Sequence, residues 1–219
     1  MRLAREGADV YLWDIDEEGL AGAVCEVSTY GVEAVGARCD LSRPEEISAE
    51  IKNLLSRWGT LDILVNNAGV GFYGPMHSMT AAQWDWLMAI NLSAPIQITR
   101  ELLPTLLARP EAHVVNMASI CGLVAGGRFA AYHPGKFGFT EALRAEYGRQ
   151  GLGVTAMCPG PVRTNLYKSS PHGIAEKPTP TPPAWVCTTA ERVAEATIRA
   201  IYRDRRMVLL TPLAHALYF

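Results

Sequence analysis

The chain has 219 residues, 49% of them hydrophobic and 19% charged, and its formal net charge is −2. This composition is typical of a globular protein with a sizeable core, and it argues against nucleic acid or an anionic membrane surface as the main partner. No apolar run reaches the roughly 18 residues of a membrane span, and the N-terminus lacks the layout of a secretory signal. The five cysteines are odd in number and far apart, which indicates reduced thiols and a cytoplasmic location.

Short apolar segments alternate with longer amphipathic ones along the whole chain. Strands are predicted at 9–13, 33–39, 61–65, 112–118, 152–158 and 206–211. Helices are predicted at 17–29, 43–57, 80–108, 131–149 and 189–203. Near-continuous apolar strands that alternate with helices are typical of a parallel sheet covered on both faces. We therefore expect an α/β fold, a doubly wound, Rossmann-like parallel sheet in three layers, as one domain over 1–219 with a proline-rich loop at about 165–188.

Three of these helices have an N-cap signal at the sequence level. Ser42 precedes a proline and two acidic residues, and Thr80 precedes Gln83 in a capping-box pattern. Thr188 or Thr189 is the expected cap before Glu191.

Polar or small residues follow five of the predicted strands, which is where open parallel sheets bind ligands. These residues are Asp14, Asp40 with Leu41, Asn66 to Gly69, Ser119, and Pro159 with Gly160. A carboxylate after such a strand either accepts hydrogen bonds from a ribose or caps the next helix, and both readings are open for Asp14 and Asp40.

A literal GxGxxG pattern occurs at residues 69–74. A dinucleotide-binding fingerprint needs its last glycine to open a helix whose N-terminus holds the pyrophosphate. Here Pro75 follows at once and the next predicted helix starts only near Thr80, so we interpret the pattern as a glycine-rich turn.

Five motifs in a fixed order carry a family resemblance. They are NNAG at 66–69, Asn91 in INLSAP, Ser119 at a strand end, Tyr132 and Lys136 in YHPGK, and PGPVRT at 159–164. With this order and spacing the chain resembles the short-chain dehydrogenase/reductase family from residue 2 to about 211. The resemblance implies an oxidoreductase that transfers hydride between NAD(P) and a secondary alcohol or ketone. It also implies a homodimer or homotetramer formed through the helices at 80–108 and 131–149.

The resemblance assigns catalysis to Asn91, Ser119, Tyr132 and Lys136. Tyr132 and Lys136 are four residues apart, so on a helix they share a face, and a nearby ammonium favours the phenolate that a general base needs. Ser119 would hydrogen-bond the reacting oxygen, and the Asn91 carbonyl would hold a water beside Lys136. The alternative readings are a surface pair for Tyr132 and Lys136, a strand-end cap for Ser119, and an Asn91 side chain bonded to neighbouring backbone.

The resemblance also implies a set of cofactor contacts. They are Asp14, Asp40, Leu41, Asn67, Ala68, Gly69, Tyr132, Lys136, Pro159, Gly160, Val162 and Thr164. The Asp14 carboxylate repels a 2′-phosphate, and no Arg or Lys follows it at 15–18, so we expect NAD rather than NADP. The five histidines show no metal-ligand spacing, and no metal is expected. The substrate wall, with Ile120, Cys121, Phe129, His133 and the loop at 165–186, is mostly apolar.

Two features depart from the family pattern. Pro134 and Gly135 replace the small residues common between Tyr132 and Lys136, and we expect the helix to begin near Tyr132. The family's first strand and its TGxxxGxG loop would precede Met1. That strand would lie between 9–13 and 61–65, so we expect the 219-residue chain by itself to bind NAD weakly or to fold poorly. The alternative function is a truncated or non-catalytic binding or scaffold protein of the same fold.

Overall fold

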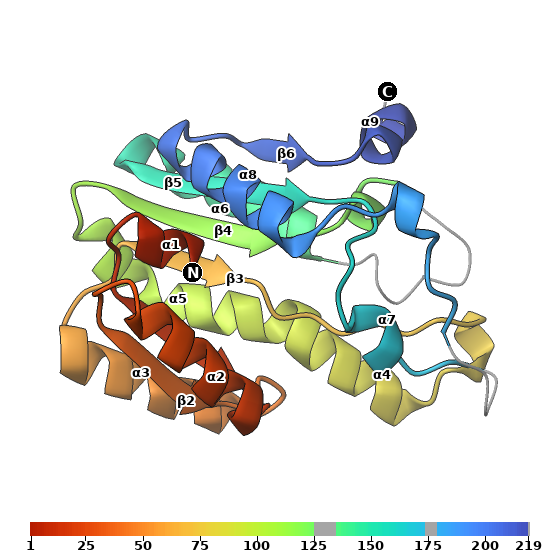
Figure 1. Cartoon of the computed structure of the whole chain (residues 1–219), viewed down its shortest axis with the longest axis horizontal. Helices are drawn as coiled ribbons and strands as arrows, with labels where there is room; N and C mark the ends of the chain where they lie inside the picture. The colour runs from red at the N-terminus through yellow and green to blue at the C-terminus, as the bar shows by residue number, and fades with distance from the viewer. Residues whose placement is uncertain (125–134, 174–178, 219) are drawn as a thin grey trace. The chain divides into compact units, whose positions relative to one another are not determined.

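A computed structural model describes residues 1–124, 135–173 and 179–218 (Figure 1). Backbone contacts divide the chain into two compact units, residues 1–60 and residues 61–219. Each unit contains its own parallel sheet, with the order β1-β2 in the first and β3-β4-β5-β6 in the second. The parallel α/β class expected from the sequence is confirmed, whereas one domain over 1–219 stays a prediction.

The first unit is a βαβ unit with a helix on each side of it in the sequence. Its elements are α1 (Arg2–Arg5), β1 (Val10–Asp14), α2 (Glu17–Ser28), β2 (Ala34–Arg38) and α3 (Pro44–Trp58). The strands pair in parallel, with Val10 opposite Ala34 and Asp14 opposite Arg38. Helix α2 packs closely on β2, because a Cβ at Gly36 would lie only 2.7 Å from Val24 of that helix.

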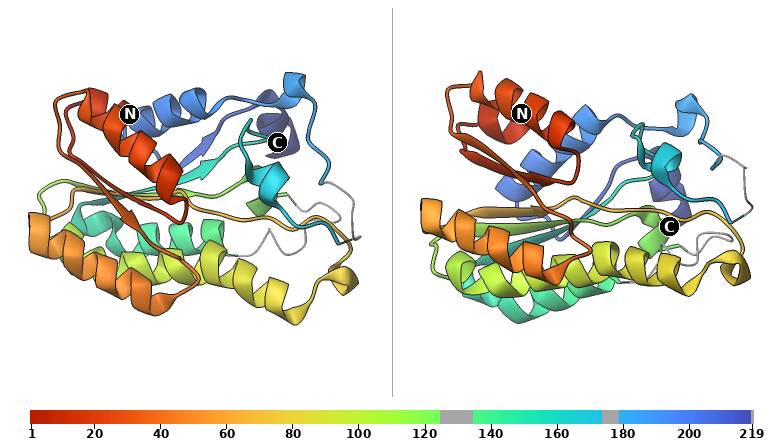
Figure 2. Two further views of the ribbon diagram at one scale, coloured as in Figure 1. Left: turned by 60° about the horizontal axis from the view of Figure 1, so that its bottom comes forward. Right: turned by 90° about the horizontal axis from the view of Figure 1, so that it is seen from below.

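The second unit contains the four-stranded sheet. Its strands are β3 (Ile63–Asn66), β4 (Ala112–Met117), β5 (Leu152–Cys158) and β6 (Met207–Leu209). Its main helices are α4 (Ala81–Met88), α5 (Ala94–Leu107), α6 (Lys136–Tyr147) and α8 (Ala190–Tyr202), and α7 (Leu166–Ser169) and α9 (Pro212–Tyr218) are short. Helices α5 and α6 cover one face of the sheet and α8 covers the other (Figure 2). This unit therefore has the predicted three layers.

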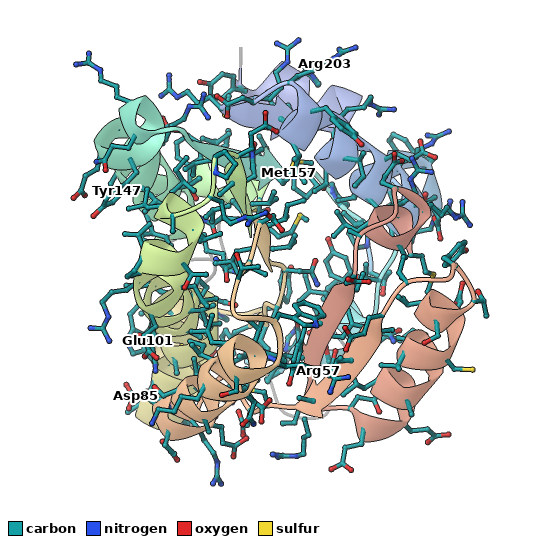
Figure 3. All side chains as sticks on the ribbon, turned by 90° about the vertical axis from the view of Figure 1, so that its left-hand side faces the viewer. Arg57, Asp85, Glu101, Tyr147, Met157 and Arg203 are labelled. Carbon is teal, nitrogen blue, oxygen red and sulfur yellow. The ribbon has the colours of Figure 1, made fainter. Side chains whose placement is uncertain are left out.

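The core of the second unit lies along β4 and β5. Every residue of β5 is buried, which is the pattern expected for a central parallel strand. Met157 of β5, labelled in Figure 3, is fully buried and packs with Ala196 and Ala200 of α8. Glu101 and Tyr147, labelled in the same view, lie on the outer sides of α5 and α6. Among the described residues, no helix combines the length and the apolar character that crossing a bilayer requires.

The predicted caps of two helices are confirmed and the third is wrong. Thr80 and Gln83 form a capping box at α4, and the Thr189 hydroxyl oxygen accepts a hydrogen bond from the Arg192 backbone N at 3.4 Å. Helix α3, however, has Arg43 as its N-cap, without a side-chain cap. Ser42 instead donates its hydroxyl at 2.7 Å to the carboxylate of Asp40, which lies two residues beyond the end of β2.

Two predicted helices have different bounds in the structure. The helix expected at 80–108 is interrupted by a π-helical segment, Ala89–Ser93. The helix expected at 131–149 begins only at Lys136, because its N-cap Gly135 has a φ of +106°, which no α-helix accommodates. The expected start near Tyr132 falls in residues 125–134, outside the described residues.

Gly135 and Gly138 provide a matched pair of substitutions at α6. A Cβ at Gly135 would lie 2.4 Å from Leu92 and adopt a positive φ, whereas a Cβ at Gly138 meets nothing within 4 Å. We expect Gly135→Ala to lower the free energy of unfolding by about 1–3 kcal/mol. We expect Gly138→Ala to raise it by about 0.5–1 kcal/mol. Urea denaturation followed by circular dichroism measures both, and equal effects of the two substitutions would contradict this account.

Candidate active site

The carboxyl ends of β3, β4 and β5 bring together residues that are far apart in the sequence. Asn66 ends β3, Ser119 follows β4, and Pro159 with Gly160 follows β5. The backbone N of Ile120 donates to the Pro159 carbonyl at 3.0 Å, which joins the ends of β4 and β5. Gly160 is buried, and a Cβ there would lie 2.3 Å from the Thr211 hydroxyl, so the close approach needs glycine.

The NNAG segment changes from buried to exposed along its length. Asn66 is 6% exposed and is the last residue of β3, whereas Asn67, Ala68 and Gly69 are exposed just beyond it. The exposed part is therefore accessible to a ligand at the strand end.

Asn91 lies in the π-helical segment and is buried. Its side-chain Oδ1 accepts a hydrogen bond from the Val70 backbone N at 2.9 Å, and its Nδ2 donates to the Val70 carbonyl at 2.7 Å. The alternative reading, a side chain bonded to neighbouring backbone, is therefore what the structure contains. Single-turn π segments inside helices are frequent at functional sites because they shift the backbone register locally.

Lys136 meets the same strand end as Asn91. Its ammonium donates a hydrogen bond to the Ala68 carbonyl at 2.5 Å. A Cβ at Gly69 would lie 3.3 Å from the Asn91 Oδ1 and 3.6 Å from the Lys136 Nζ. Burial of the ammonium lowers the pKa of Lys136 to about 8, because desolvation disfavours the charged form. The site thus contains a desolvated ammonium whose pKa lies well below that of an ordinary lysine.

Ser119 is half-buried at the start of a short 3₁₀ helix, Ile120–Gly122. Its hydroxyl oxygen accepts a hydrogen bond from the Cys121 backbone N at 3.1 Å. The alternative of a strand-end cap is therefore observed, and an O–H that accepts one bond can still donate another. Its predicted partner Tyr132 lies outside the described residues, as do Phe129 and His133.

The PGPVRT segment forms one wall of a pocket. A parallel bridge joins Val162 to Thr188, with Arg163 N donating to the Thr188 carbonyl at 3.0 Å. The pocket residues come from this segment, from α7 and from the proline-rich loop, and they are Val162, Arg163, Thr164, Asn165, Tyr167, Lys168, Thr181, Pro182, Ala184 and Cys187. Val162 and Thr164, two of the predicted cofactor contacts, therefore share one pocket.

The predicted adenosine contacts lie at the carboxyl ends of β1 and β2. Asp14 is exposed and accepts a hydrogen bond from Asp16 N at 3.0 Å, while Asp16 is the N-cap of α2. The Asp40 carboxylate accepts two hydrogen bonds from Ser42, which lower its pKa. Neither Asp14 nor Asp40 is a helix N-cap, so that alternative is wrong for both. Leu41, the third of these contacts, is half-buried beside Asp40.

Arg38 and Asn116 are two residues that sequence reasoning missed. Arg38 is the register partner of Asp14 and forms ion pairs with Glu46 at 3.0 Å and with Glu17 at 3.7 Å. Asn116 is fully buried in β4. A polar residue inside the apolar run HVVNM is the signal that points to it. Within the described ranges no cluster of three or more His, Cys, Asp or Glu residues suits a metal ion.

Three known proteins illustrate what the chain is similar to. A dehydrogenase of Xanthobacter autotrophicus, 2-(S)-hydroxypropyl-CoM dehydrogenase 3, is 35% identical over 161 residues, which cover 72% of this chain and 63% of that protein. The solved structure of a short chain dehydrogenase/reductase from Burkholderia phymatum in complex with NAD has a TM-score of 0.84 and 27% identity. It covers 98% of this chain and 85% of that one. A metagenomic short-chain oxidoreductase in complex with NADP has a TM-score of 0.76 and 28% identity, covering 95% and 87%.

A family model described as short chain dehydrogenase matches residues 1–174. The first curated relatives are matched over 63–66% of their own length, so the chain spans less than two thirds of them. The family match and the motifs at 66–69, 91, 119, 132–136 and 159–164 agree. The chain therefore belongs to the short-chain dehydrogenase family.

Proposed function

We propose that this protein is an NAD(P)-dependent oxidoreductase that interconverts a secondary alcohol and a ketone, with Tyr132 as the general acid/base. The observation that carries the proposal is the meeting of Asn91 and Lys136 at Gly69. A Cβ atom on Gly69 would lie within 4 Å of both the Lys136 Nζ and the Asn91 Oδ1. The two side chains therefore meet at the carboxyl edge of a parallel sheet. Structural roles alone do not require a desolvated lysine at that edge, because burying an ammonium costs free energy.

The described residues suit a dinucleotide. Asn67, Ala68 and Gly69 present exposed backbone at the strand end, and Val162 and Thr164 line a pocket. These residues, together with Lys136, would hold the nicotinamide ribose and the nicotinamide. A nicotinamide cofactor supplies or accepts the hydride. Pro159 and Gly160 shape the backbone that leads into this pocket.

Residues of this chain transfer the proton of the substrate hydroxyl. Tyr132 takes the alcohol proton during oxidation or returns it during reduction, and a nearby cation stabilises its phenolate. Lys136 supplies that charge, and its pKa of about 8 makes the charge dependent on pH around neutrality. Ser119 orients the reacting oxygen through its hydroxyl, and Asn91 holds the Val70 backbone beside Lys136.

The preference for NAD over NADP rests on Asp14. Its exposed carboxylate suits a ribose 2′-hydroxyl and repels a 2′-phosphate. Arg38 lies opposite in register, but its guanidinium already forms ion pairs with Glu17 and Glu46. A 2′-phosphate beside Asp14 would therefore be repelled by that carboxylate, and the cation opposite it is already paired with two others. Asp40 and Leu41 would contact the adenine.

The proposal also covers the substrate class, the location and the oligomeric state of the enzyme. We infer a small-molecule substrate with an apolar body, because the apolar residues Ile120 and Cys121 directly follow Ser119 in the 3₁₀ helix after β4. The chain acts in the cytoplasm, as its odd number of widely spaced cysteines indicates, and as a homodimer or homotetramer, as the family resemblance implies.

A non-catalytic binding protein of the same fold is the second candidate. One observation favours it: the N-cap Gly135 has a positive φ, so α6 begins at Lys136. Such a protein would bind the dinucleotide without turnover.

Replacing Tyr132 tests the catalytic proposal. We expect Tyr132→Phe to lower kcat for secondary-alcohol oxidation by about 10²–10⁴-fold, because the proton acceptor is lost. NADH affinity, measured by cofactor fluorescence, should fall by no more than about tenfold, the effect of one lost hydrogen bond to the cofactor. Tyr147→Phe is the matched control, since Tyr147 lies on the outer side of α6 (Figure 3), and it should leave kcat unchanged. Full turnover by Tyr132→Phe would refute the proposed role, and NADH binding without turnover by the unmodified chain would favour the second candidate.

Replacing Asp14 tests the cofactor preference. We expect NADH to bind at least about tenfold more tightly than NADPH, and Asp14→Ala to reduce that ratio by about tenfold. The neutral side chain no longer repels the 2′-phosphate. Asp85→Asn on α4, which removes an exposed charge elsewhere, should leave the ratio unchanged. Isothermal titration with both nucleotides gives the values, and tighter binding of NADPH to the unmodified chain would overturn the preference.

A further inference from the structure

A chain of buried polar side chains runs through the layer between the sheet and helices α5 and α6. Asn116 of β4 is fully buried, and its Oδ1 accepts a hydrogen bond from Asn66 Nδ2 at 2.7 Å. Its own Nδ2 donates to the Thr140 hydroxyl oxygen at 2.9 Å. A buried amide with no partner costs free energy, so these bonds make an asparagine tolerable inside an apolar strand.

This hydrogen-bonded series of side chains ends at the backbone of Lys136. Thr140 is 1% exposed, and its hydroxyl donates to the Lys136 carbonyl at 2.5 Å. At the other end, Asn66 Nδ2 donates to the Thr99 hydroxyl oxygen of α5 at 3.2 Å. The directions of these bonds follow from the groups, because an amide NH₂ only donates, a hydroxyl has one proton to give, and a carbonyl only accepts.

Lys136 is consequently attached to the end of β3 at two points. Its carbonyl is reached from Asn66 through Asn116 and Thr140. Its ammonium bonds the carbonyl of Ala68, which lies two residues beyond Asn66. The hydrogen bonds and the short segment from Asn66 to Ala68 close a ring. A ring of this kind restricts the first turn of α6, which Gly135 leaves without helical continuation before Lys136.

We propose that Asn116 and Thr140 are positioning residues for Lys136, holding its backbone so that its ammonium stays at the strand end formed by Ala68 and Gly69. The importance of Lys136 for catalysis rests on the proposed function, but the attachment itself does not. Neither positioning residue touches the reacting atoms. Their effect is transmitted through the hydrogen bond to the Lys136 carbonyl.

Thr99 supplies the matched control. It is as buried as Thr140, at 1% exposure, and it also bonds the side chain of one of the two network asparagines from a helix. Its hydrogen bond lies at the other end of the series of buried side chains, on α5, away from Lys136. If the network served only general stability, Thr99→Val and Thr140→Val would have the same effect on the titration of Lys136. If it positions Lys136, only Thr140→Val should change that titration.

The experiment is an NMR titration of the full chain grown with lysine labelled with ¹³C at Cε. The lysines are Lys52, Lys136, Lys168 and Lys177, and Lys136→Arg identifies the resonance of interest. In the unmodified chain we expect Lys136 to titrate near pH 8, the value that burial gives its pKa. In Thr140→Val the first turn of α6 loosens and water reaches the ammonium, so the midpoint should rise by about one pH unit or more toward the ordinary lysine value.

The controls distinguish positioning from a general loss of stability. Thr99→Val should leave the midpoint within about 0.3 pH units of the unmodified chain, and Thr140→Ser, which keeps the hydroxyl, should restore it. If Thr140→Val does not fold, Thr140→Cys, with a weak S–H donor, takes its place and should shift the midpoint in the same direction. An unchanged midpoint in the Thr140 variant, or an equal shift in Thr99→Val, would overturn the proposal.

The same variants separate this inference from the proposed function. The titration needs neither cofactor nor turnover. A shifted midpoint in a chain that shows no oxidoreductase activity would therefore contradict the proposed function and leave the positioning of Lys136 intact. In an active chain, Thr140→Val should lower kcat by about tenfold or more, because the defect lies in the reacting geometry.

Discussion

The hydrogen bond from the Lys136 ammonium to the Ala68 carbonyl is the contact on which the candidate site depends. It brings the first residue of α6 to the end of β3, although Ala68 and Lys136 are 68 positions apart in the sequence. Burial of the ammonium there lowers the pKa of Lys136 to about 8. A lysine held in this way loses its proton at a lower pH than an exposed lysine on a helix surface does.

The surroundings of this bond are arranged to tolerate it. Asn91 occupies both polar groups of the Val70 backbone, so the turn after β3 keeps its shape beside the ammonium. Asn116 and Thr140 bond the other end of the same lysine. A buried amide is otherwise unfavourable in an apolar strand such as β4. Its burial is tolerated when both its NH₂ group and its carbonyl oxygen are hydrogen-bonded.

The first unit carries a separate electrostatic feature. Asp14 and Arg38 are opposite each other in register at the ends of β1 and β2, but Arg38 pairs with Glu17 and Glu46. The Asp14 carboxylate thus remains exposed, with one hydrogen bond from the backbone of Asp16. This distribution of charge suits a hydroxyl more than a phosphate, and it gives the proposed preference for NAD a physical basis that does not depend on family membership.

The amino-acid sequence by itself determined the order and type of the main elements, because apolar periodicity and capping residues act locally. The strands at β1 to β5 and the capping box at Thr80 follow from such patterns. The same holds for the motifs that indicate the family. Only the tertiary structure decided that α6 begins at Lys136, that Asp16 rather than Asp14 caps α2, and that Asn116 joins Asn66 to Thr140. These outcomes depend on which polar groups meet across the fold, and a polar group takes the partner that is nearest in space, which its neighbours in the sequence do not reveal.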